Sequence, residues 1–184
     1  MAEIAGLKLI VPSSVSAASG TIAVSASGKV TFTTAGTVSV NGCFSATHDN
    51  YLVVFRGLSS SGASLELYLR ASGSDATGSN YVWQRLTADS TSVSGERQSS
   101  QSVTRIGVVD TTNYSGFHAY FYGPNLAQPT AARSVTAGAN SGALIQDFAT
   151  THSLSTAYDG FTLRREGGGA ATLTGALTVY GLSQ

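Results

Sequence analysis

The stretch Leu65-Glu66-Leu67-Tyr68-Leu69-Arg70 decides the fold class. Its three leucines alternate with an acidic, an aromatic and a basic residue, and successive side chains of a β-strand point to opposite faces of the sheet. The leucines therefore share one face and the other three side chains share the opposite face. This pattern is typical of a half-buried antiparallel strand that packs one face against a core.

The same alternation recurs along the chain at intervals of about 8–14 residues, and turn-forming pairs such as Asn41-Gly42 separate the apolar runs. The predicted strands are Leu7–Val11, Ile22–Ser27, Val30–Thr33, Thr37–Asn41, Tyr51–Arg56, Leu65–Arg70, Tyr81–Thr87, Val103–Val109, Phe117–Tyr122, Arg133–Ala137, Phe161–Arg165 and Thr172–Leu182. A single open sheet of that many strands would leave two bare faces and long edges. The sequence therefore predicts an all-β fold, an antiparallel β-sandwich of jelly-roll type with about ten to twelve short strands.

Two segments depart from the alternation. Gly142–Thr151 is the best candidate for a helix. Its Leu144, Ile145 and Phe148 have roughly helical spacing, whereas its β-branched neighbours and the absence of strong caps oppose a helix, so both states stay open. Ser90–Ser102 is polar and has no apolar pattern, which predicts a long exposed loop.

Length and composition indicate one ordered domain. The chain has 184 residues, of which 42% are hydrophobic, enough to bury a core and too many for a disordered chain. We expect residues 1–29 to supply an N-terminal arm or the first strands, and residues 30–184 to form the sandwich, within one domain overall. Leu7–Val11 either adds a strand to a neighbouring molecule or is the first strand of the chain's own sandwich.

The charge balance excludes several classes of partner. Ten basic and ten acidic residues cancel, so no basic stripe is available to neutralise a phosphate backbone. The start of the sequence lacks a basic segment followed by an apolar run, and no apolar stretch is long enough for a membrane span. We therefore expect no nucleic acid, no membrane and no signal peptide.

Contiguous catalytic and metal-binding motifs are absent from the sequence. Cys43 and His48 are close enough in sequence to share a zinc ion, but two further ligands in a recognisable pair are missing, which favours Cys43 as a small buried hydrophobe. His48-Asp49-Asn50 is better explained as a polar turn before the next strand. The sequence predicts no metal and no cofactor.

Scattered catalytic groups give no stronger signal. A serine triad drawing on His48, His118 or His152 is expected by chance in a chain so rich in serine. The carboxylates that a glycosidase would need have no spacing that singles out two of them. These carboxylates are Glu66, Asp147, Asp159 and Glu166. We expect a protein that is not an enzyme and has no catalytic residues.

Aromatic residues provide the best candidates for a contact site. Tyr81-Val82-Trp83 is one cluster, and Phe117–Tyr122 is the other. Alternation in the second places Phe117, Ala119 and Phe121 on one face and a His-Tyr-Tyr stripe on the other. The candidate ligand or subunit contacts are Trp83, His118, Tyr120 and Tyr122. Packing of the stripe on a neighbouring subunit or under a loop is favoured over a ligand platform, although an aromatic ring can also stack on a sugar.

Three groups of segments resemble small β-domains encoded among the virion genes of tailed bacteriophages. The segments are Thr37-Val38-Ser39-Val40-Asn41-Gly42-Cys43-Phe44-Ser45 with Asp49-Asn50-Tyr51-Leu52-Val53-Val54, then Leu67-Tyr68-Leu69-Arg70-Ala71-Ser72-Gly73-Ser74-Asp75 with Ser79-Asn80-Tyr81, and finally Asp159-Gly160-Phe161-Thr162-Leu163 with Gly175-Ala176-Leu177-Thr178-Val179-Tyr180-Gly181. They spread over roughly residues 30–182. The resemblance implies a jelly-roll-like surface module of the minor tail or tail-fibre type, which forms a homotrimer. It supplies no catalytic residues.

These expectations lead to a ranked set of functions. The first is a structural protein on the exterior of a tailed bacteriophage virion, made in the host cytoplasm, associated with the tail and with other virion proteins, and binding a host surface receptor, glycan or protein. The second is a capsid decoration protein that stabilises the head. The third is a free carbohydrate-binding or hydrolytic β-sandwich domain.

Overall fold

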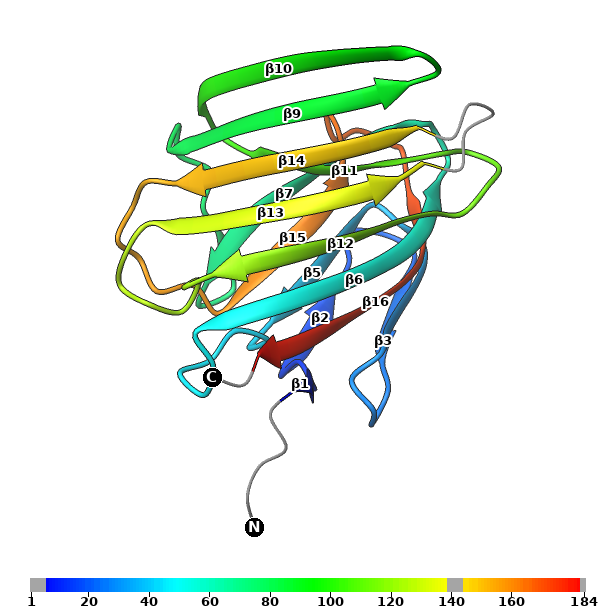
Figure 1. Ribbon diagram of the computed structural model, residues 1–184. Coiled ribbons are helices and arrows are strands. Elements are labelled where there is room, and N and C mark those ends of the chain that lie inside the picture. The colour runs from blue at the N-terminus through cyan, green and yellow to red at the C-terminus, as the bar shows by residue number, and fades with distance from the viewer. Residues whose placement is uncertain (1–5, 139–143, 183–184) are drawn as a thin grey trace.

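The computed structural model describes residues 6–138 and 144–182 of the chain. These residues contain no helix and form sixteen strands in two sheets that pack on each other (Figure 1). The strands are β1 (Leu7–Ile10), β2 (Ser14–Ser16), β3 (Thr21–Val24), β4 (Val30–Ala35), β5 (Thr37–Asn41), β6 (Asn50–Ser59), β7 (Ala63–Ala71), β8 (Ser74–Asp75), β9 (Tyr81–Asp89), β10 (Ser92–Gln101), β11 (Thr104–Val109), β12 (Ser115–Tyr122), β13 (Thr130–Ala137), β14 (Ile145–His152), β15 (Gly160–Arg165) and β16 (Leu173–Leu182). The predicted all-β antiparallel sandwich is confirmed, with more strands than the ten to twelve expected.

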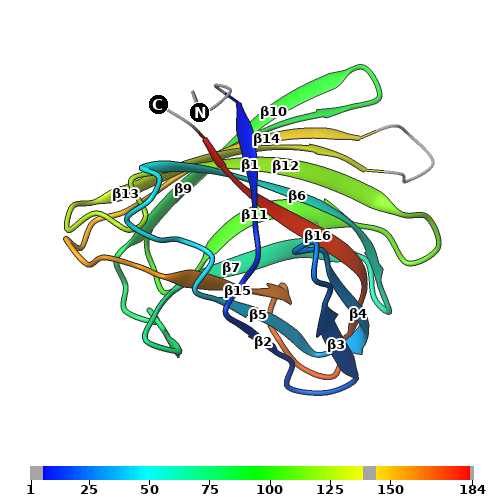
Figure 2. The same cartoon turned by 90° about the horizontal axis from the view of Figure 1, so that it is seen from below.

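The strand order is that of a jelly roll with additions. The larger, ten-stranded sheet runs β10-β9-β14-β13-β12-β6-β16-β4-β3, with β1 also paired to β16, and the smaller sheet runs β11-β7-β15-β5-β2, with β8 beside β7. At the centre, β4-β16-β6-β12 faces β5-β15-β7-β11, and the chain crosses between the sheets from β4 to β5, β6 and β7 in turn. Figure 2 shows these two layers from below. The pairs β9–β10 and β13–β14 widen one sheet only.

The core lies between the two sheets and is built by period-two burial. Leu65, Leu67 and Leu69 of β7 point into it, as the alternation predicts. The rings of Phe121 and Phe161, from opposite sheets, lie with centroids 6.2 Å apart and nearly parallel. Such pairs fix the distance between the layers, because aromatic side chains fill most of the space between them.

The other face of β7 is more buried than the sequence indicates. Glu66 is 8% exposed and Tyr68 is 7% exposed, although both point away from the core. Arg164 of the neighbouring β15 covers them: its Nε donates to Glu66 Oε2 at 2.7 Å, and its guanidinium lies 4.8 Å from the Tyr68 ring centroid. This strand is therefore covered on both faces, and not half-buried.

The N-terminal segment belongs to both sheets. β1 pairs antiparallel with β16, from Leu7 opposite Leu182 to Ile10 opposite Val179. β2 pairs with β5 in the smaller sheet, and β3 pairs with β4 in the larger one. Of the two alternatives left open for Leu7–Val11, the structure shows the strand of the chain's own sandwich.

The structure decides one segment that the sequence left open and differs from the prediction in another. The described part of Gly142–Thr151 is not helical: Ile145–Thr151 lie in β14, where Phe148 points inward and Ala149 points outward, because β13 and β9 pair with this strand on both sides. Gly142 and Ala143 lie outside the described residues. Most of Ser90–Ser102 is the strand β10, whose residues are largely exposed on both faces. An edge strand of this kind is held by backbone pairing with β9, so it needs no apolar alternation.

Candidate functional site on the outer face of the ten-stranded sheet

The aromatic stripe of β12 points outward. Phe117, Ala119 and Phe121 are buried in the core, so their neighbours project from the opposite face of the sheet. We call His118, Tyr120 and Tyr122 the aromatic stripe. The His118 and Tyr120 rings meet edge to face at 6.0 Å, and the Tyr120 and Tyr122 rings are nearly parallel at 6.5 Å between centroids. Since Tyr122 is 45% exposed, the stripe presents a ring surface to solvent.

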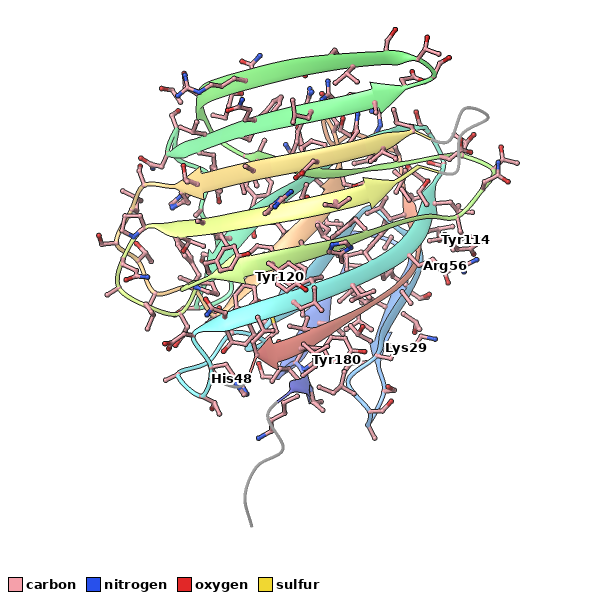
Figure 3. The ribbon with its side chains drawn as sticks, viewed as in Figure 1. Lys29, His48, Arg56, Tyr114, Tyr120 and Tyr180 are labelled. Atoms are coloured by element: carbon pink, nitrogen blue, oxygen red, sulfur yellow. The ribbon has the colours of Figure 1, made fainter. Side chains whose placement is uncertain are left out.

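The aromatic surface continues across the neighbouring strands. Tyr120 stands opposite Leu52 of β6, which stands opposite Tyr180 of β16. Figure 3 shows Tyr120 and Tyr180 on the same face of the sheet. Leu52, between them in register, is only 8% exposed although it points away from the core. In the row formed by Tyr120, Leu52 and Tyr180, side chains of the sheet therefore cover part of its outer face.

An apolar patch lies toward one end of the same face. It consists of Val54, Leu86, Val93, Val135 and Ile145, which come from five different strands. In register, Val54 and Val135 flank His118, Ile145 and Val93 flank Ala88, and Leu86 stands opposite Asp147. Leu86 and Ile145 are each 54% exposed and Val93 is 77% exposed. Exposed apolar side chains grouped on one face in this way mark interaction surfaces in soluble proteins.

Arg56 of β6 stands between two shallow depressions on this face. Its direct cross-strand neighbours are Ala176 of β16 and Gly116 of β12, the two smallest side-chain types, so space opens on both sides of it. Tyr114 is the residue directly before β12. The Arg56 guanidinium lies 4.2 Å from the centroid of its ring. The depression beyond Ala176 has a volume of about 480 Å³, and Lys29 also lines it.

The two depressions differ in chemistry. The one beyond Ala176 is lined by hydroxyls and two cations, and the one beyond Gly116 is lined mainly by apolar side chains that include Val54, Val135 and Ile145. No carboxylate lines either depression in the described part of the chain. The outer face therefore combines a cationic groove with an apolar patch.

Trp83 lies apart from the stripe. It points inward from β9 and is 3% exposed, with the Arg105 guanidinium 4.8 Å from its ring centroid. Tyr81, two residues earlier, is buried on the same side, because alternation orients both rings inward. Of the four candidate contact residues, the structure brings His118, Tyr120 and Tyr122 together and buries Trp83.

Sequence reasoning missed Arg56 and Tyr114. Arg56 closes a predicted strand, and its outward direction follows from the inward Phe55. Nothing in the sequence shows that Tyr114, in a polar connection before β12, would lie against it. The only available signal is an arginine on an outward position with no acidic residue near it in sequence.

The groups considered for catalysis lie in separate environments. Cys43 is fully buried, and burial raises the pKa of its thiol. His48 Nδ1 lies 3.3 Å from the carbonyl oxygen of Leu182, whereas His118 belongs to the outer stripe. His152 is buried beside Tyr158, whose hydroxyl lies 3.0 Å from Nδ1, and burial lowers the His152 pKa. The described residues include no cluster of three or more His, Cys, Asp or Glu that could hold a metal ion.

Most of the carboxylates considered for glycoside hydrolysis are paired with arginines. The ion pairs are Arg70–Asp75, Arg85–Glu96, Arg105–Glu96, Arg105–Glu166, Arg133–Asp147 and Arg164–Glu66. Asp159 Oδ2 accepts a hydrogen bond from the Ser72 backbone at 3.0 Å. Glu66 and Asp147 lie on the outer faces of different sheets. These carboxylates take part in structural contacts.

Among the described segments, none is a helix with the length and apolar character of a membrane span. No protein-family model matches the chain, and no curated protein sequence is significantly similar to it.

Proposed function

We propose that the chain is a structural protein on the exterior of a tailed bacteriophage virion, associated with the tail, which contacts a host surface receptor or glycan through the outer face of its ten-stranded sheet. The observation that carries the proposal is the joint exposure of the aromatic stripe and the apolar patch on one broad face of the sandwich. The resemblance of the segments around Phe44, Arg70 and Phe161 to phage virion β-domains supports the phage assignment.

A sheet face suits adhesion because the backbone ladder fixes the direction in which each side chain projects. The backbone of Tyr120 is paired on both sides and its ring contacts those of His118 and Tyr122, so less conformational entropy is lost when a partner packs on it. Tyrosine also offers an apolar ring and a polar hydroxyl, which suits both sugar and protein surfaces. We propose that the apolar patch contacts neighbouring copies in a homotrimer and that the rest of this face stays open to the host surface.

Electron microscopy of purified particles tests the location. A gold label directed at the chain should decorate the tail of the particle. Label on the head would overturn the tail assignment and would favour a capsid decoration protein. Chain recovered only free of particles would overturn both, and would direct attention to a free carbohydrate-binding or hydrolytic domain, for which hydrolysis of candidate glycans by the purified chain is the direct assay.

A further inference from the structure

We propose that the groove between Lys29 and Arg56 binds an acidic saccharide of the host surface, with a carboxylate or phosphate group on the cations and sugar hydroxyls on the surrounding threonines. This inference rests on the proposed host-adhesion function and names the ligand class of one part of the same face. The groove crosses β4, β16 and β6, and Figure 3 shows Lys29, Arg56 and Tyr114 at the same end of the sheet.

The cations in the groove are free to bind an anion. Arg70, Arg85, Arg105, Arg133 and Arg164 each form an ion pair with a carboxylate. In the part of the chain that the structure describes, Lys29 and Arg56 form none, and no acidic residue lines their groove. A chain of zero net charge therefore leaves two cations together on one surface without local compensation.

The orientation of Arg56 suits recognition of a planar anion. Its guanidinium lies over the Tyr114 ring at 4.2 Å, a cation–π contact that restrains the side chain. The donor edge of a restrained guanidinium can form two parallel hydrogen bonds with a carboxylate or phosphate, which a lysine cannot do. Tyr114 is 41% exposed, so part of its ring also stays open to the apolar face of a sugar.

Hydroxyl groups supply the remaining contacts. Thr31, Thr33 and Thr178 line the groove, and their side chains have no hydrogen-bond partner among the described residues. A threonine hydroxyl can both donate and accept, which matches the hydroxyls of a saccharide. A nucleic acid is a poor alternative, because two cations neutralise too few phosphates for useful affinity at physiological salt.

Calorimetric titration with a paired set of ligands tests the proposal. The probes are oligogalacturonate, its fully methyl-esterified form, and a glycerol-phosphate polymer substituted with sugars. The unmodified chain should bind at least one of the two anionic probes and bind the neutral ester at least tenfold more weakly. Equal binding of the ester and the acid would overturn the proposal, and so would absence of binding to both anionic probes.

Matched variants locate the site. Arg56→Gln should weaken binding of the anionic probe by about 10- to 100-fold, the usual effect of losing a hydrogen-bonded charge. Arg97→Gln removes the same charge from an exposed position at the far edge of the sheet and should leave binding unchanged. Equal losses in the two variants would show non-specific attraction and would overturn the proposal.

A substitution that fills the groove without changing its charge tests whether the ligand occupies the groove. Ala176→Leu fills the groove beside Arg56 without changing any charge, and should abolish binding while the thermal melting profile stays cooperative. Binding as tight as that of the unmodified chain would overturn the groove assignment. If the chain binds neither anionic probe but gold label decorates the tail, the proposed function stands and the saccharide site is wrong. If the chain binds an anionic probe but the label decorates the head, only the tail assignment is wrong.

Discussion

Tyr120 is the residue at the centre of the proposed contact face. Its ring lies between His118 and Tyr122 on the exposed side of β12, and its neighbours in register are Leu52 and Arg133. It contributes to the outer surface and not to the core. Changes at this position should therefore affect recognition more than folding.

We expect Tyr120→Ala to weaken either self-association or ligand binding by about tenfold or more, since truncating a central tyrosine in an interface costs this much. Light scattering and ligand titration measure the two effects, and a melting temperature close to that of the unmodified chain shows that the protomer is folded. Tyr120→Phe, which keeps the ring, serves as the control. Unchanged association and binding in the alanine variant would remove the stripe from the proposed site.

Burial of His152 should make the free energy of unfolding depend on pH. Burial lowers its pKa below the ordinary value of 6.5 in the folded protein, so the unfolded chain binds the proton more readily. The free energy of unfolding should be greatest above about pH 6.5 and should decrease as the pH falls below this value. Urea denaturation at a series of pH values from neutral to mildly acidic measures the trend.

Two variants test whether this pH dependence comes from His152 and not from His118. His152→Phe should remove most of the decrease in unfolding free energy between neutral and mildly acidic pH. His118→Gln, on the outer face, should keep that decrease. An unfolding free energy independent of pH in the unmodified chain would contradict this assignment.

At the scale of the elements, β7 carries the core of the smaller sheet. Leu67 is 2% exposed and lies between β15 and β11 in register. Leu67→Asp would place a carboxylate among apolar side chains, so we expect the chain not to fold, with a loss of several kcal/mol of stability at least.

Circular dichroism and solubility measure the effect of Leu67→Asp. Val54→Asp introduces the same carboxylate on the exposed face of β6, where the valine is 39% exposed, and should leave a soluble, cooperatively melting protein. A Leu67→Asp variant that melts like the unmodified chain would show that the inward direction of β7 is wrong.

The elements also show how far the sequence predicts the structure. Strands with a strong apolar alternation, such as β7 and β12, are located correctly, including the direction of Phe117 and Phe121. β10 is missed because a solvated edge strand is held by backbone pairing with β9, which requires no apolar pattern. β14 is ambiguous because the spacing of Ile145 and Phe148 fits a helix, until pairing on both sides selects the extended state.

The candidate site is only partly predictable for the same physical reason. The stripe of β12 comes from one strand, so local alternation reveals it. The contact of Arg56 with Tyr114 joins β6 to a connection far along the chain, and it depends on Gly116 and Ala176 leaving room. The register of the sheet creates this site, and the register cannot be read from the sequence of any single segment.

At the scale of the whole molecule, the apolar patch is the proposed surface for self-association. We expect the double variant Leu86→Ser, Ile145→Ser to lower the oligomer mass measured by light scattering, because two side chains that are each 54% exposed lose their apolar contact area. Leu154→Ser changes a leucine of similar exposure outside the patch and should not alter the mass. An unmodified chain that is monomeric at high concentration would contradict the homotrimer.

The position of β16 has a consequence for synthesis. This strand lies in the middle of the larger sheet, between β6 and β4, yet it comes after all the other described strands in the sequence. Until Leu173–Leu182 has emerged, the facing edges of β6 and β4 have no neighbour, and the nascent chain carries two bare strand edges that can pair with other chains. Truncations that remove Leu173–Leu182 should therefore yield insoluble protein, and the larger sheet should close only once this segment is present.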